Sequence, residues 1–164
     1  MAGAFLEDRA PRLRVTTAGT HVVEGMPMSW RTRDAIAEFG AERTMHRSHQ
    51  LNDADVAAAD VVICLAAEHV AYMRRTHPEA AAKTVTLRRL ARDLPAASGA
   101  SFRERVAALH LADAELDASD DVQDPAGGDL PVFRACAREI HDLIDLLVPE
   151  LTPEATQEDV EEIA

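Results

Sequence analysis

The fold is indicated most clearly by one short apolar run, Asp60-Val61-Val62-Ile63-Cys64-Leu65. After its first residue the run has no polar alternation, which is typical of a strand buried on both faces of a parallel sheet. A helical pattern follows over residues 67–76, and residues 83–87 form another short run with β-branched residues. Strand, helix and strand in this order predict a right-handed parallel crossover.

Outward from this unit, the sequence predicts one more strand and several helices. Residues 12–17 alternate polar and apolar side chains and predict the strand. Ser29 and Gly40 are typical of the two ends of a helix. The predicted helices cover residues 1–9, 29–39, 52–58, 67–76, 103–116 and 130–147. The expected fold class is therefore α/β, a three-layer α/β/α arrangement around a small parallel sheet.

In such sheets ligands bind beyond the carboxyl ends of the strands. The segments that follow the predicted strands are residues 18–25, 66–69 and 87–94, and a polar loop at 120–129 precedes the last helix. We expect the functional side chains in these segments.

Composition bounds the class of protein. The 164 residues, 47% of them hydrophobic, suit one domain with a real core. A net charge of −12 argues against a nucleic-acid partner, since phosphate contacts need clustered Lys and Arg. No apolar run approaches the roughly 18 residues needed to span a membrane, and the first residues lack a signal-peptide pattern. We expect a cytoplasmic protein with no membrane partner.

The acidic residues are concentrated at the end of the chain. Residues 150–164 hold six acids and no basic residue. Such a segment is typical of a solvated, disordered tail. We therefore expect a domain over residues 1–149 and an acidic tail over residues 150–164.

The two cysteines are interpreted as structural. Cys64 lies inside the apolar run and Cys136 in the middle of the last predicted helix. Neither has the spacing of a disulfide framework or a metal site, so no metal is expected. Trp30, in the helix over residues 29–39, is expected in the core.

Six segments, in chain order, resemble the low-molecular-weight protein tyrosine phosphatases. Thr17-Ala18-Gly19-Thr20-His21 resembles the family's Ser-Ala-Gly-Thr after its second strand, and residues 27–40 its following Pro-x-x-x-Arg helix. His46-Arg47-Ser48-His49-Gln50-Leu51 resembles His-x-Ala-Arg-Gln-hydrophobic, with His49 in place of the usual arginine. Residues 60–65 resemble the Asp-hydrophobic strand, and Glu68-His69 the start of the next helix. Asp121-Val122-Gln123-Asp124-Pro125 resembles the Asp-Val-x-Asp-Pro loop, and the match spans roughly residues 1–147.

The family's nucleophile motif, Cys-x-Gly-Asn-x-Cys-Arg-Ser-Pro, has no counterpart in the sequence. In the family it lies between the first, central strand and the first helix. Met1-Ala2-Gly3-Ala4-Phe5-Leu6 matches the residues that follow its Ser-Pro. We expect the first strand and this loop to be missing through a start assigned downstream of the true one, and the chain as given to be inactive.

The resemblance implies roles for particular residues. Asp124 matches the general acid that protonates the leaving oxygen of a cysteinyl-phosphate reaction, and Pro125 fixes the backbone beside it. Thr17 and His46 match side chains that support the phosphate-binding loop. Val22, Val23 and Ala126 stand where the family usually has the aromatic walls of the phosphotyrosine pocket, which weakens a strict phosphotyrosine preference.

The implied function is hydrolysis of phosphomonoesters, with a phosphorylated protein or a small phosphomonoester as substrate and with no cofactor. Two alternatives stay open. An arsenate reductase shares the fold, although the redox cysteine pair it needs is not evident. A non-catalytic pseudo-phosphatase would use the same surface as a binding module.

Overall fold

The structure, a computed structural model, describes residues 1–42 and 45–152. Its elements follow one another as α1 (Ala2–Arg9), α2 (Trp30–Ala37), α3 (Asp53–Ala58), β1 (Val62–Cys64), α4 (Ala67–Thr76), β2 (Thr84–Thr86), α5 (Leu87–Asp93), α6 (Phe102–Ala108) and α7 (Leu130–Leu151). Short 3₁₀ turns, η1 (Pro78–Lys83), η2 (Leu94–Ala96) and η3 (Ala118–Asp120), lie between them. No helix of the described part is long and apolar enough to cross a membrane.

The sheet of the described residues consists of β1 and β2. The strands are parallel, and Val62, Ile63 and Cys64 face Thr84, Val85 and Thr86 in register. α4 connects them, as the strand–helix–strand pattern predicts. The parallel strand–helix–strand unit predicted from the sequence is therefore confirmed.

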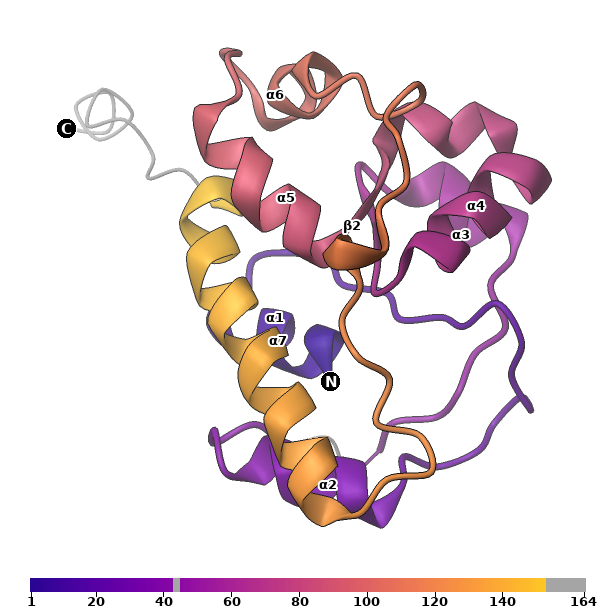
Figure 1. The fold of residues 1–164 in the computed structure, drawn as a ribbon, viewed down its shortest axis with the longest axis vertical. Coiled ribbons are helices and arrows are strands. Elements are labelled where there is room, and N and C mark those ends of the chain that lie inside the picture. The colour runs from indigo at the N-terminus through magenta and orange to yellow at the C-terminus, as the bar shows by residue number, and fades with distance from the viewer. Residues whose placement is uncertain (43–44, 153–164) are drawn as a thin grey trace, which may run out of the picture.

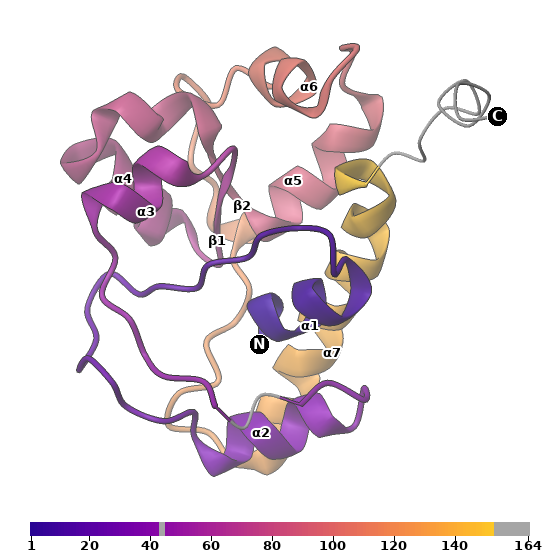
Figure 2. The ribbon, with the colours of Figure 1, turned by 180° about the vertical axis from the view of Figure 1, so that it is seen from behind.

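Helices cover both faces of this sheet and give the expected three layers (Figures 1 and 2). One core is formed by α1, α2, α5, α6 and α7, and Ile63 packs against it. A second, smaller core lies under α3 and α4, and takes up Cys64. Because neighbouring side chains of a strand point to opposite faces, β1 joins the two cores.

The predicted helix ends agree with the structure where a side chain caps the backbone. Ser29 Oγ accepts the backbone N–H of Thr32, and α2 begins at the next residue after Ser29. Asn52 and Asp55 form a capping box at α3. Gly40, after α2, has a φ of 77°, which glycine adopts without strain.

Two of the predicted elements need correction, and one helix was missed. The burial of residues 12–17 alternates, but the segment begins in a turn and forms no ladder with another described segment. The helix predicted over residues 103–116 ends at Ala108, because the chain turns at His110, whose φ is 49°. Residues 87–94 follow a strand as predicted, but they form α5 and the start of η2, a helix that the sequence analysis did not predict.

Two predictions on single residues have opposite outcomes. Trp30 is 56% exposed, so the prediction that it lies in the core was wrong. Cys64 and Cys136 are buried and free, as a structural role requires. Glu150 lies in α7, and residues 153–164 of the predicted tail lie outside the described residues.

Candidate active site

Asp124 lies on an exposed loop, residues 121–129, that enters α7. Its carboxylate accepts the backbone N–H of Ala126 at 2.9 Å, and Gly128 N–H donates to the Pro125 carbonyl at 2.9 Å. Gly127 adopts a φ of 80° in this turn. These local bonds set the direction of the Asp124 side chain and leave its second oxygen at the surface.

The loop is fastened at its start to the carboxyl end of β1. Val122 N–H donates to the Leu65 carbonyl at 2.8 Å, and Asp121 Oδ1 accepts the N–H of Ala67 at 2.6 Å. Val122 itself is buried. The loop that carries Asp124 therefore starts at the sheet edge where parallel α/β folds bind ligands.

Val22 and Val23 lie on a second loop, residues 18–27, which we call the wall loop. It is held by residues 46–51: Gly25 N–H donates to the Ser48 carbonyl at 2.9 Å, and Val22 N–H donates to the Gln50 side chain at 3.1 Å. Val22 is half-buried, whereas Val23 is 73% exposed. The wall loop thus presents two large hydrophobic side chains, Val23 and Met26, to solvent.

Figures 1 and 2 show the wall loop, residues 46–51 and residues 121–129 on the same side of the molecule, between the sheet and α2. The sequence-predicted residues Asp124, Pro125 and Ala126 come from one of these segments, and Val22 and Val23 from another. These residues therefore lie on the same side of the molecule, on two separate loops.

Thr17 lies against the first turn of α1. A Cβ built on Gly3 would stand 2.2 Å from Thr17 Cγ2, so the Thr17 side chain packs directly on the backbone of Gly3. His46 is half-buried at the start of the segment that holds the wall loop, and its carbonyl accepts from Arg47 Nη1 at 2.9 Å. Both residues are placed by local packing, and their supporting role stays a prediction.

His49 lies between two carboxylates, an arrangement that the sequence analysis did not predict. Its Nε2 is 2.8 Å from Asp55 Oδ2, and its Nδ1 is 3.3 Å from Glu24 Oε1. The hydrogen bond with Asp55, followed by that with Glu24, raises the pKa of His49 above its ordinary value. The backbone N–H of Gln50, followed by the His49 side chain, lowers the pKa of Glu24.

Neither cysteine has the surroundings of a nucleophile. Burial raises the pKa of the Cys64 thiol to about 12. Burial, followed by the charge of Glu139, also raises the pKa of Cys136, although the positive Met1 amino group lowers it. Reactive cysteines have the opposite shift, since the thiolate is the nucleophile.

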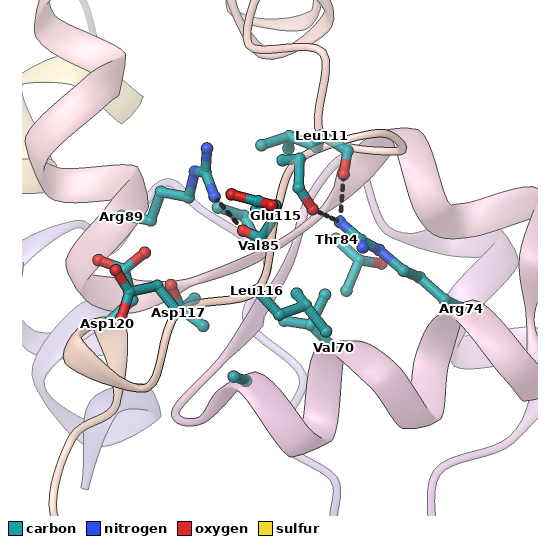
Figure 3. Close-up of a pocket in the computed structure, with 13 residues that line it drawn as sticks. Val70, Arg74, Thr84, Val85, Arg89, Leu111, Glu115, Leu116, Asp117 and Asp120 are labelled. Carbon is teal, nitrogen blue, oxygen red and sulfur yellow. Dashed lines mark hydrogen bonds between the residues drawn. The ribbon is translucent and has the colours of Figure 1, made fainter.

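A small pocket beside β2 has too little room for a substrate (Figure 3). Its volume is about 10 Å³, and substrate pockets occupy roughly 300–1,000 Å³. Arg74 closes it by donating to the carbonyls of Leu111 and Ala114, both at 2.7 Å. The pocket is lined by residues between 111 and 120, the segment that precedes the Asp124 loop.

A larger hollow of about 400 Å³ lies between α5 and α7. Its two arginines are already paired: Arg88 with Glu139 at 2.7 Å, and Arg92 with Asp120 at 2.5 Å. A phosphate group would have to displace these carboxylates, so the hollow is a poorer candidate than the Asp124 side of the sheet.

Comparison with known proteins decides the family. The family described as low molecular weight phosphotyrosine protein phosphatase matches residues 1–97. The chain belongs to this family. The Asp124 loop, residues 121–129, lies outside the matched range. The fold of a low molecular weight phosphatase accounts for the parallel crossover and for the loops at its edge.

Individual relatives agree with this assignment. A protein-arginine-phosphatase of Geobacillus stearothermophilus is 30% identical over 155 residues, which are 94% of this chain and 88% of the relative. The solved structure of an arginine phosphatase from the same organism has a TM-score of 0.71 at 29% identity, covering 92% of this chain and 82% of that one. A low molecular weight protein tyrosine phosphatase from T. tengcongensis has a TM-score of 0.70 at 25% identity, covering 92% and 88%.

Two features of this low molecular weight phosphatase site were missed from sequence. Asp121 was noted only as part of a motif, and its bond to Ala67 bridges two segments far apart in the chain. Glu24 and Asp55 gave no local signal either, because they approach His49 only when the wall loop and α3 are in place. The one available signal was the change from arginine to His49, which keeps a basic side chain at this position.

Proposed function

We propose that this protein is part of a protein phosphatase that removes phosphate from phosphorylated side chains, with Asp124 as general acid. The observation that carries the proposal is the placing of Asp124: an exposed carboxylate, oriented by the Ala126 N–H, on a loop fastened to the carboxyl end of β1. Its family and its relatives support the reaction class.

The proposed reaction has two steps. A cysteine thiolate attacks phosphorus and the bond to the leaving atom breaks, while the Asp124 carboxyl gives its proton to that atom. The Asp124 carboxylate then takes a proton from water, the water oxygen attacks the cysteinyl-phosphate, and inorganic phosphate and the thiolate are released. Asp124 regains its proton and no cofactor takes part.

The nucleophile is not among the cysteines of this sequence. Cys64 and Cys136 are buried with raised pKa values, and neither is followed by an arginine at the spacing of the family motif. We propose that the nucleophile and a phosphate-binding arginine are carried by a segment joined ahead of Met1, and that the 164-residue chain alone turns nothing over.

The substrate is proposed to be phosphotyrosine or phosphoarginine in a protein. Val22, Val23 and Ala126 leave the pocket without the aromatic walls that stack on a phenol ring. The relative named protein-arginine-phosphatase favours the second substrate. Arsenate reduction and phosphopeptide binding without turnover remain the alternatives. We place the protein in the cytoplasm, where two free thiols stay reduced.

The reading frame upstream of Met1 tests the proposal. A Cys-x-Gly-Asn-x-Cys-Arg-Ser-Pro segment there supports a phosphatase, and an in-frame stop overturns catalysis. The extended protein is then assayed with p-nitrophenyl phosphate, a phosphotyrosine peptide and a phosphoarginine peptide, beside the 164-residue chain. Turnover by the extended form alone is expected; turnover of arsenate with a thiol reductant, but of no phosphorylated substrate, would favour the reductase.

A further inference from the structure

We propose that His49 is a positioning residue whose protonated ring ties Glu24 of the wall loop to Asp55 of α3, and that loss of its proton releases the Glu24 end. The consequence for substrate rests on the proposed function, because it takes Val22 and Val23 as walls of the substrate pocket. The titration itself does not depend on that function.

The geometry joins three segments of the chain. His49 Nε2 lies 2.8 Å from Asp55 Oδ2 and His49 Nδ1 lies 3.3 Å from Glu24 Oε1. The second oxygen of Glu24 accepts the backbone N–H of Gln50 at 2.7 Å. The charged groups that face the ring are thus one carboxylate from the wall loop and one from α3. Val23 directly precedes Glu24, and Ser48 Oγ donates to the Val23 carbonyl, so the Glu24 contact adds a second restraint beside the exposed wall residue.

Only the charged ring satisfies both carboxylates. An imidazolium donates from both nitrogens, whereas a neutral imidazole donates from one and presents a lone pair at the other. A lone pair facing a carboxylate oxygen is repelled by it. The amide Nδ2 of Asn52, 3.3 Å from Nε2, donates to that nitrogen only when the ring nitrogen carries no proton. The carboxylate of Asp55 is closer and charged, so Nε2 keeps the proton in the neutral ring.

The Glu24 end is therefore the one that opens. Asp55 is held by the capping box of α3, where its Oδ2 also accepts the N–H of Asn52 at 3.2 Å. Its side chain is 20% exposed. Glu24 is 63% exposed and lies on a loop, at the longer of the two contacts. Repulsion at Nδ1 moves Glu24 away and weakens its bond to the Gln50 N–H.

The direction of the pH dependence follows from the two hydrogen bonds. Asp55, and then Glu24, raise the pKa of His49 above its ordinary value of 6.5. We call the wall loop closed when His49 contacts both Glu24 and Asp55. The closed wall loop is therefore fully stabilised below pH 6.5, and this stabilisation is lost as pH rises through the raised pKa. By linkage, loss of the proton lowers the ratio of closed to open wall loop. The factor is the acid dissociation constant of the His49 ring in the open state divided by that in the closed state.

Nuclear magnetic resonance of the 164-residue chain tests this. We expect the His49 ring to titrate above the ordinary histidine range, with the amide signals of Val23 and Gln50 following the same transition. Glu24→Gln is expected to lower the His49 pKa, and His49→Arg, which stays charged, to abolish the transition while keeping the wall loop closed. His69→Gln is the matched control, since His69 is 40% exposed and lies 3.9 Å from Glu68, its own neighbour in the sequence.

Two results would overturn the proposal: a His49 pKa unchanged by Glu24→Gln, or Val23 and Gln50 signals that do not move with the ring. In the extended, catalytic form, KM for a phosphopeptide should rise with pH in the parent protein but not in His49→Arg, with kcat much less affected. A protein without any turnover defeats the proposed function and leaves the titration standing. Turnover with equal KM profiles defeats the positioning role.

Discussion

Asp121 caps α4 across a distance of 54 residues in sequence. Its Oδ1 accepts the N–H of Ala67 at 2.6 Å, while the N-cap position itself, Ala66, has no side chain that could do so. A carboxylate at a helix N-terminus satisfies a free N–H and interacts favourably with the helix dipole. The same bond fixes the loop that carries Asp124, three residues further along.

Replacing Asp121 should therefore affect stability and the Asp124 loop together. We expect Asp121→Ala to lower the free energy of unfolding by about 1 kcal/mol, the usual cost of a lost helix cap. Asp121→Asn retains an acceptor and should cost less. Urea unfolding followed by circular dichroism measures the change. In the catalytic form, kcat should fall as well, because the acid loses its fixed position.

Asp113→Ala serves as the matched control, since Asp113 is an exposed aspartate of the segment that precedes the loop. It should leave the unfolding midpoint nearly unchanged. Equal losses in the two variants would show that net charge, and not the cap on α4, determines the stability.

Asp124→Asn should separate catalysis from folding. The asparagine oxygen still accepts the N–H that Asp124 now accepts from Ala126, so the unfolding midpoint should stay unchanged. The proton donor is lost, and kcat of the extended protein should fall by about 10²-fold or more. The loss should shrink for aryl phosphates with acidic phenols, which leave without protonation. Gln123→Ala, an exposed neighbour, is the control, and a kcat unaffected by Asp124→Asn would refute the acid role.

Local signals predicted the helix ends, and long-range contacts explain the misses. α2 and α3 begin where Ser29 and Asn52 bind nearby backbone N–H groups, an interaction fully contained in a few residues. The helix predicted over residues 103–116 ends at Ala108 because the chain turns at His110, and beyond this turn Arg74 of α4 binds the carbonyls of Leu111 and Ala114. No pattern within residues 103–116 carries that information.

The segment over residues 12–17 shows the same limit for a strand. Its alternation correctly gives the alternating burial, with Leu13, Val15 and Thr17 half-buried between exposed neighbours. A strand also needs a partner backbone, which alternation does not specify. For the site, the motif predicts the role of Asp124, which stays a prediction, whereas the neighbours of His49 come from two other segments and needed the structure.

Cys64 should be unreactive in the folded chain. Burial raises its pKa from the ordinary value of 9.0 to about 12, so almost no thiolate is present at neutral pH. We expect iodoacetamide at pH 8 to modify Cys64 only after unfolding, as measured by mass spectrometry. The folded state keeps a proton that the unfolded state releases, so stability should also fall as pH rises above about 9. Rapid labelling under native conditions would contradict the structural assignment.

Gly3 is the position where the smallest change should disturb the packing of α1 on Thr17. A Cβ at residue 3 would lie 2.2 Å from Thr17 Cγ2, closer than any van der Waals contact. Elsewhere in a helix, alanine for glycine stabilises by up to about 1 kcal/mol. Here we expect Gly3→Ala to destabilise by about 1–3 kcal/mol, as overpacking does. Thermal unfolding measures the loss.

A double-mutant cycle identifies the cause. Thr17→Ser removes the methyl group that the new Cβ would meet and keeps the hydroxyl. Alone it should cost about 1 kcal/mol for the lost methyl. Combined with Gly3→Ala it should restore most of the stability, because Val15 Cγ1, the next neighbour, is 3.7 Å from the Cβ position, an ordinary contact distance. Additive losses would mean that Gly3 is required for another reason, such as the backbone conformation of the first turn, and that its approach to Thr17 is incidental.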